Sequence, residues 1–163
     1  MRTGLKRILF SAIMVSPAWA APSDKPVSIA NPAALAEVLR DMGYQPGELV
    51  RDTKNPAFNV TLGDQPTRVT FGGCTGGANC KYIYMSSSYS DVPNPPTDWL
   101  NRMNDAFDII KVDTDADNDL FFSAAHVIEG VPRSTLRLIL DMWIADANAL
   151  AQEAVSAKLN TGR

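Results

Sequence analysis

The chain has 163 residues, 45% of them hydrophobic, with 15 basic and 18 acidic side chains and a formal net charge of −3 at pH 7. This length suits a single domain, which can bury one core without help from metals or many disulfides. The negative charge repels nucleic acid phosphates, and no run of basic residues with interleaved aromatics offsets it. Nucleic acid binding is therefore disfavoured.

Residues 1–20 have the three parts of a secretory signal peptide. Basic residues near the start are followed by an apolar stretch, residues 8–15, that is too short for a bilayer span, which needs about 20 residues. Ala18-Trp19-Ala20 then places small side chains where signal peptidase requires them. We expect cleavage after Ala20, export to the periplasm or beyond, and no stable membrane anchor afterwards. The mature chain carries 12 basic and 18 acidic side chains, a charge of about −6.

The two cysteines, Cys74 and Cys80, lie in a glycine-rich segment that also contains Gly72-Gly73 and Gly76-Gly77. In an oxidising compartment we expect them to form a disulfide, because each has no other partner. The spacing is not that of a Cys-x-x-Cys redox motif, and two cysteines with one histidine fall short of a four-ligand zinc site. The sequence therefore predicts a staple across a turn.

Asn31-Pro32 is typical of a helix start and Gly43 of a helix stop, with apolar residues at helical spacing between them. Segments with strand character follow at Glu48–Arg51, Phe58–Leu62, Arg68–Phe71 and Lys81–Met85. The turn sequence in residues 63–66 predicts a hairpin between the second and third of these segments.

A proline-rich connector, residues 91–96, is expected to end the last of these strands and to lead into a second helix. That helix has Trp99 on its apolar face and ends near Ile109. Residues 110–112 and 120–124 flank an acidic turn and predict a second hairpin. A last helix over residues 132–158 has an apolar stripe that includes Trp143.

These elements predict an α+β fold, an antiparallel sheet of about five strands packed against helices. Their order is helix, strands, helix, two strands, long helix, and most connections between strands are too short for parallel crossovers. We expect residues 21–30 to be a flexible mature N-terminus, residues 31–158 a single domain, and residues 159–163 a tail.

Several of these motifs resemble the YbjN-like family, described as bacterial sensory transduction regulators. The most specific part is residues 69–80, a strand followed by paired cysteines in a short loop. The resemblance continues in residues 100–104, similar to the family's asparagine-rich helix motif, in Phe107, and in Glu129-Gly130-Val131 before the last helix. Met103 departs from the pattern, since an aromatic residue is more usual there.

The resemblance implies a fold similar to type III secretion chaperones and no agreed biochemical activity. Such folds bind peptides, or pair with themselves, through exposed sheet or helix surfaces. We therefore expect an exported, non-enzymatic interaction module, chaperone-like or regulatory, that uses no cofactor. Its partner would be an unidentified envelope protein or peptide, or a second copy in a homodimer. Trp99 and Trp143 are candidates for the partner surface, although both also fit the apolar faces of their helices.

The acidic turn offers an alternative function. Asp113, Asp115, Asp117 and Asp119 alternate like the start of a calcium loop, which supports a weak calcium-binding module. The twelfth position, however, is Ala124, where an EF-hand requires a bidentate glutamate. A solvated hairpin turn explains the same residues, because Asp and Asn bond to their own backbone in tight turns.

An uncharacterised hydrolase is a second alternative, which would have to use His126, the only histidine. No Gly-x-Ser-x-Gly elbow accompanies it, and residues 86–88, a run of three serines, have no base near them in the pattern. A partly buried structural histidine is the simpler interpretation, and no residue is assigned a catalytic role.

Overall fold

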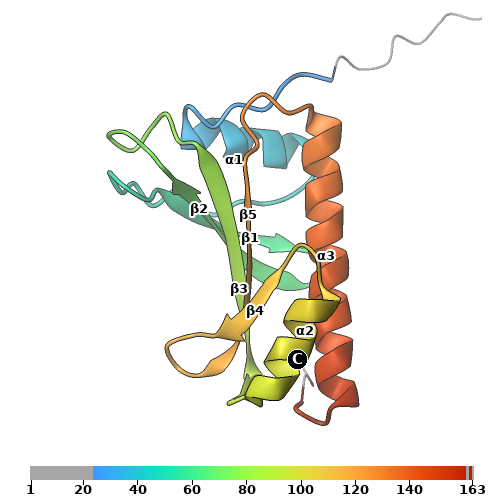
Figure 1. Cartoon of the computed structure of the whole chain (residues 1–163). Helices are drawn as coiled ribbons and strands as arrows, with labels where there is room; N and C mark the ends of the chain where they lie inside the picture. The colour runs from blue at the N-terminus through green and yellow to red at the C-terminus, as the bar shows by residue number, and fades with distance from the viewer. Residues whose placement is uncertain (1–23, 161, 163) are drawn as a thin grey trace, which may run out of the picture.

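The computed structural model describes residues 24–160 and 162, which form one sheet and three helices (Figure 1). In chain order the elements are α1 (Pro32–Asp41), β1 (Ala57–Leu62), β2 (Gln65–Gly72), β3 (Tyr82–Pro93), α2 (Thr97–Ala106), β4 (Lys111–Thr114), β5 (Asp119–His126) and α3 (Arg133–Ser156). The α+β class and the order of elements predicted from the sequence are confirmed. The predicted signal peptide lies outside the described residues.

The five strands lie in the order β1-β2-β3-β5-β4, and every neighbouring pair is antiparallel. The predicted hairpins are β1–β2 and β4–β5. In the first, Leu62 pairs with Gln65, so Gly63 and Asp64 alone make the turn, and Gly63 has a φ of 60°. Helix α2 connects β3 to the far edge of the sheet, and β5 then returns between β3 and β4.

One face of the sheet is apolar and is covered by the helices. Side chains alternate along each strand, so every second residue points to the same face. The buried residues of this covered face include Phe58, Val60, Leu62, Val69, Phe71, Ile83, Met85, Leu120 and Phe122. α3 runs along this face, with α1 near one end of the sheet and α2 near the other (Figure 1).

Trp143 anchors α3 to the middle of the sheet. Its side chain is 0% exposed and stacks on Phe122 at 5.0 Å between ring centroids, and Phe122 stacks in turn on Tyr89. The indole Nε1 donates a hydrogen bond of 3.0 Å to Thr67 Oγ1, and the Tyr89 hydroxyl donates one of 2.8 Å to the carbonyl of Ala147. Contacts with β2, β3 and β5 therefore fix the position of the helix.

The flexible N-terminus expected over residues 21–30 is corrected for its described part, residues 24–30, which packs on the domain. Val27 and Ile29 are 1% and 0% exposed. The backbone of Val27 bonds to Val131 and Gly130 at 2.8 Å each, and the Ile29 N–H donates to Glu129 Oε2 at 2.6 Å. The prolines of this segment suggested a flexible chain, although Val27 and Ile29 alternate like the residues of a strand. The groups that they contact lie about 100 residues later in the chain, so no local pattern indicated them.

The same segment caps α3. The helix begins after Pro132, which provides no side-chain cap, and Asp24 supplies one from a distant part of the chain. Its Oδ1 accepts a hydrogen bond of 3.0 Å from the Ser134 N–H, and its Oδ2 accepts one from the Ser134 hydroxyl. These two bonds hold the pKa of the Asp24 carboxyl below its usual value. Asp24 thus does for α3 what a local N-cap residue does for other helices.

Two strand predictions are wrong. Residues 48–51 form only a single bridge, from Val50 to Ala57, because the chain turns away at Asp52, whose Oδ1 accepts from the N–H groups of Lys54 and Asn55. β3 extends through Pro93 instead of ending before the proline-rich connector. Its pairing with β5 is irregular between Tyr89 and Pro93, and proline is tolerated where the ladder is interrupted.

Among residues 24–160 and 162, we find no helix with the length and apolar character needed to cross a bilayer.

We predict that Asp24→Ala lowers the melting temperature at neutral pH and that this effect fades in acid. A carboxyl whose pKa is lower in the folded than in the unfolded state stabilises the fold above its unfolded pKa, and the gain is lost as pH falls through the folded value. The difference in melting temperature between wild type and variant should be largest near pH 6 to 7 and should shrink below about pH 4. Asp105→Ala, an exposed acid on α2, is the control; a difference independent of pH would contradict the charged cap.

Candidate binding surface

No described helix lies on the face of the sheet opposite α3 (Figure 1). We call it the outer face, and it comprises Asn59, Thr61, Arg68, Thr70, Tyr84, Ser86, Ser88, Lys111, Asp113, Phe121, Ser123 and Ala125. Most of these side chains are short and polar, which is why this face can remain in water. Antiparallel sheets commonly have one packed and one solvated face.

Strand register arranges the outer face in rows. Arg68 pairs with Asn59 on one side and with Ser86 on the other, and Ser86 pairs with Ser123, which pairs with Lys111. Two small serines thus lie between two cations. The serines are only 9% and 8% exposed, because larger neighbours stand around them. The centre of the outer face is therefore lower than its surroundings.

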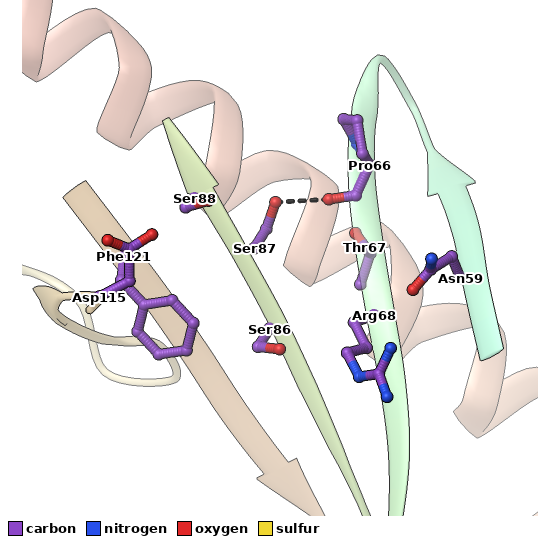
Figure 2. A pocket seen from close by; sticks show the side chains of 9 residues that line it. All are labelled: Asn59, Pro66, Thr67, Arg68, Ser86, Ser87, Ser88, Asp115 and Phe121. Carbon is purple, nitrogen blue, oxygen red and sulfur yellow. Dashed lines mark hydrogen bonds between the residues drawn. The ribbon is translucent and has the colours of Figure 1, made fainter. Parts of the chain in front are cut away.

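A depression of about 350 Å³ occupies this region (Figure 2). It is lined by Asn59, Pro66, Thr67, Arg68, Ser86, Ser87, Ser88, Asp115 and Phe121. A second hollow of about 210 Å³ shares Pro66 and Ser88 with the first and extends to Asp64 and Asp91. Together they form a trough over β2, β3 and the adjoining turns, of a size that accommodates several ligand atoms.

The floor of the trough is held by buried hydrogen bonds. The Ser87 hydroxyl donates to the carbonyl of Pro66 and accepts from the Gln65 side-chain amide. Thr67 Oγ1 donates to the carbonyl of Gln65 at 3.2 Å and accepts from Trp143. Because Trp143 belongs to α3, the packing of the covered face also sets the shape of the outer face.

Arg68 and Ser86 are among the polar side chains of the depression that have no partner among the described residues. Arg68 makes neither an ion pair nor a hydrogen bond there, although Asp115 lines the same depression. Ser86 is 9% exposed as a residue, and its hydroxyl reaches solvent and makes no hydrogen bond with the described part of the chain. A free hydroxyl donor beside an unpaired guanidinium is a position where a ligand can supply the acceptor.

Both edges of the sheet are blocked. At β1, Gly47 N–H donates to the carbonyl of Asn59 at 2.7 Å, and Val50 and Ala57 exchange backbone bonds of 2.8 and 3.1 Å. At β4, the amide of Asn104 accepts from Val112 N–H at 2.9 Å and donates to the Val112 carbonyl at 2.7 Å. Covered edges oppose the addition of a further strand. The helix motif of residues 100–104 contains Asn104, but nothing in that motif indicates this role.

Of the four acidic residues proposed as a calcium loop, Asp115 and Asp117 lie in the β4–β5 turn, and Asp113 and Asp119 lie on the strands beside it. Asp115 Oδ1 accepts from the N–H groups of Asp117 and Asp119, both at 3.0 Å, and Asp113 Oδ1 accepts from Thr114 N–H at 2.8 Å. Among the described residues, no three His, Cys, Asp or Glu side chains are grouped so that they could share a metal ion. The turn interpretation accounts for these contacts, and calcium binding stays a prediction.

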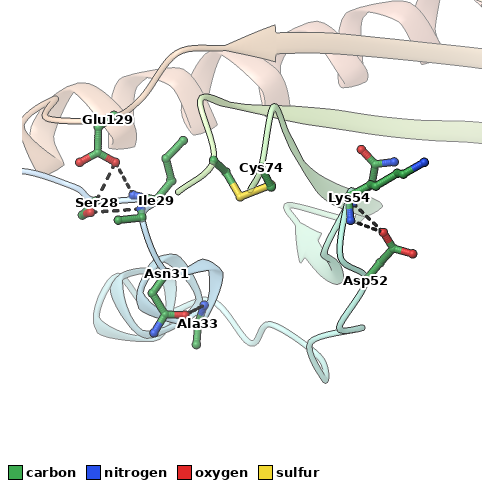
Figure 3. Close-up of a disulfide and its surroundings, with 11 residues drawn as sticks. Ser28, Ile29, Asn31, Ala33, Asp52, Lys54, Cys74 and Glu129 are labelled. Atoms are coloured by element: carbon green, nitrogen blue, oxygen red, sulfur yellow. Dashed lines mark hydrogen bonds between the residues drawn. A yellow bond between two sulfur atoms is a disulfide. The ribbon is translucent and has the colours of Figure 1, made fainter. Parts of the chain in front are cut away.

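The Cys74–Cys80 disulfide is present, in the loop between β2 and β3 (Figure 3). Cys80 is 5% exposed. Asn79 N–H donates to the carbonyl of Ala30 at 2.7 Å, and Gly77 N–H donates to that of Thr53 at 2.8 Å. Gly77 has a φ of 79°, and a Cβ at this position would lie 3.1 Å from the carbonyl oxygen of Asp52, so a larger residue would be strained and crowded there. The loop ties down neighbouring segments and contributes no residue to the depression.

Trp99 and Trp143, the two candidates for a partner surface, are 3% and 0% exposed. This expectation is corrected, because both side chains belong to the core and cannot touch a partner. The sequence could not separate the two roles, since a buried and an exposed tryptophan occupy the same kind of apolar stripe.

His126 does not lie beside the serine run of residues 86–88. By strand alternation it faces the covered side of the sheet, whereas Ser86 and Ser88 face outward. Ser87 pairs with Phe122, which lies four positions from His126 along β5, or about 13 Å. His126 Nε2 is buried without a partner in the described part of the chain, and burial lowers the pKa of the ring. The sheet therefore does not bring His126 together with Ser86, Ser87 or Ser88.

Comparison with known proteins identifies a family and a fold. The family model YbjN, described as "Putative bacterial sensory transduction regulator", matches residues 31–154. The crystal structure of an uncharacterized protein from Methanothermobacter thermautotrophicus is similar with a TM-score of 0.54, at 9% identity, over 78% of this chain and 98% of that one. No curated protein matches the chain. At this identity the structural likeness concerns the fold alone.

We predict that Asn104→Ala destabilises the protein by about 1–3 kcal/mol, because the backbone groups of Val112 lose their partners. Urea unfolding measures the change. Asn101→Ala, on the exposed side of the same helix, is the matched control and should have little effect. Equal stabilities of the two variants would contradict the role of Asn104 at the edge of β4.

We predict that Asp115→Ala lowers stability by about 1 kcal/mol, since two N–H groups of the turn lose their acceptor. The loss should be the same with and without millimolar calcium in thermal unfolding. A ligand that binds only the native state must raise its melting temperature. A rise in wild type on adding calcium, absent in Asp115→Ala, would restore the calcium-binding alternative.

Proposed function

Because the chain belongs to the YbjN family, we propose that it is a non-enzymatic interaction module that binds a segment of another polypeptide on the outer face of its sheet. The role is chaperone-like or regulatory, and the bound segment belongs to a protein of the cell envelope. The observation that carries this proposal is the trough over β2 and β3, on the one broad surface of the described sheet that no helix covers.

The rest of the sheet offers little to a partner. Helices occupy the covered face, and Asn104 and residues 47–50 occupy the edges. A partner that adds a strand would have to displace these groups, each of which satisfies backbone hydrogen bonds. A partner that lies across the outer face displaces only water. The shape of the fold therefore favours recognition through side chains over recognition by strand addition.

We extend the proposal to an oxidising compartment outside the cytoplasm. The disulfide supports this, since disulfides persist mainly in such compartments. The signal-like sequence of residues 1–20 points the same way.

A homodimer remains part of the proposal, with α3 as its contact. Leu138 and Met142, one turn apart on the solvent side of α3, are 58% and 37% exposed. An apolar pair of this kind is small compared with a standard interface. Self-association through α3 would leave the outer face free, so the two forms of binding are compatible.

Photocross-linking in the native cell tests the proposal. A photoreactive phenylalanine analogue replaces Ser88, which is exposed on the outer face, or Leu138, which is exposed on α3. We expect Ser88 to cross-link to a different envelope protein and Leu138 to give either no product or the homodimer. A heterologous product from Leu138 alone would place the partner site on α3 and overturn the proposal.

A further inference from the structure

The charge and packing of the depression specify the chemistry of what it binds. Resting on the function proposed above, we propose that the bound polypeptide presents a carboxylate to Arg68 and an apolar side chain to Phe121, about three residues apart. The depression would then bind peptides that carry one carboxylate near an apolar side chain, and it would not bind every unfolded chain.

Arg68 is the recognition group. It is an exposed guanidinium on β2, it lines the depression, and no described carboxylate lies within ion-pair distance of it. A guanidinium presents a planar fork of donors that matches a carboxylate, and such charge-assisted bonds are stronger than neutral ones. The mature chain has a net negative charge, so an unpaired arginine in a hollow is a local exception to the overall repulsion of anions.

Ser86 supplies a second donor next to it. Arg68 and Ser86 pair directly across β2 and β3, and both line the depression (Figure 2). Ser86 as a residue is only 9% exposed, and its hydroxyl, which still reaches solvent, has no hydrogen-bond partner among the described residues. A carboxylate oxygen bound to Arg68 from above can also accept from Ser86. One ligand group would thus satisfy both unpaired donors.

Phe121 provides the apolar side of the site. It lies on β5 and pairs with Ser88, and Ser88 leaves its ring partly exposed in the depression. Arg68 and Phe121 are separated by two strand spacings across the sheet and two residues along it, or about 12 Å, which an extended chain of three to four residues spans. A single free amino acid is too short to reach both, and this separation favours a polypeptide.

The acidic residues around the trough limit the number of carboxylates that can bind. Asp115 lines the same depression, and Asp64 and Asp91 line the hollow that continues from it. A strongly acidic segment would be repelled at these ends. One carboxylate at Arg68, with neutral or basic residues beyond it, fits this arrangement.

The carboxylate can be a chain end or an acidic side chain, and peptide binding distinguishes them. The probes carry an uncharged fluorophore at the N-terminus: Gly-Ser-Leu-Ala-Ala with a free C-terminus, the same peptide amidated, and amidated Gly-Leu-Ala-Ala-Glu-Gly. Fluorescence anisotropy with the mature, oxidised protein measures binding. We expect the amidated first peptide to bind at least about tenfold more weakly than one or both of the carboxylate peptides. Preference for the first or third peptide identifies the source of the carboxylate.

Variants of the protein locate the site. Arg68→Gln should weaken binding of the preferred peptide by about tenfold, and Ser86→Ala by about threefold, while Arg68→Lys should retain part of the affinity. Lys111→Gln is the matched control, because Lys111 lies on the same outer face, three strand spacings or about 14 Å from Arg68. Circular dichroism and melting curves confirm that each variant is folded.

Three results would overturn the inference. Equal losses in Arg68→Gln and Lys111→Gln would mean non-specific attraction of anions. Equal affinity for the free and amidated peptides would exclude carboxylate recognition and yet leave polypeptide binding on the outer face intact. If no peptide binds but Ser88 still cross-links to an envelope protein, carboxylate recognition at Arg68 is wrong, and the proposed binding of a partner on the outer face still holds.

Discussion

The attachment of α3 to one face of the sheet is the interaction on which the rest of the structure depends. Trp143 is the centre of this attachment, because it stacks on Phe122 and donates a hydrogen bond to Thr67. A fully buried tryptophan contributes a large apolar area, and its N–H is satisfied. The same contact gives the sheet one covered face and one outer face. It also links the core to the hydrogen bonds of Gln65, Thr67 and Ser87 beneath the trough.

Asymmetry between the faces accounts for where a partner can bind. The helices bury the apolar side chains of the sheet. The backbone groups at its two edges are hydrogen-bonded to Asn104 and to the segment around Val50. What remains is a solvated face of short polar residues, hollowed where Ser86 and Ser123 lie between larger neighbours. Recognition there depends on the few groups that can form directional or apolar contacts, which are Arg68, Ser86 and Phe121.

Much of the fold could be predicted because its signals are local. Asn31 accepts from Ala33 N–H as the N-cap of α1, and Gly43 has the positive φ that its position after the helix indicated. The apolar stripe of α3 predicted the burial of Trp143, although the same stripe was compatible with an exposed role. The spacing of Cys74 and Cys80 predicted their disulfide.

The features that could not be predicted depend on distant parts of the chain. Asp24 caps a helix that begins about 110 residues later, and no local pattern indicates such a partner. Arg68 and Ser86 are adjacent only because of the β2–β3 register, so a serine run and a lone arginine gave no site signal in the sequence. Asn104 was noticed as part of a motif, but its role at β4 requires the path of the chain after α2.

Backbone chemical-shift mapping by NMR tests the central claim, that the outer face is the binding surface, most directly. The isotope-labelled mature protein would be titrated with the two carboxylate peptides described above, acetylated at the N-terminus in place of the fluorophore, each of which presents one carboxylate and one leucine side chain. The account predicts shifts or line broadening centred on Arg68, Ser86, Ser88 and Phe121, with residues on the solvent side of α3 unchanged. Perturbations confined to Leu138 and Met142, or to the two sheet edges, would contradict it.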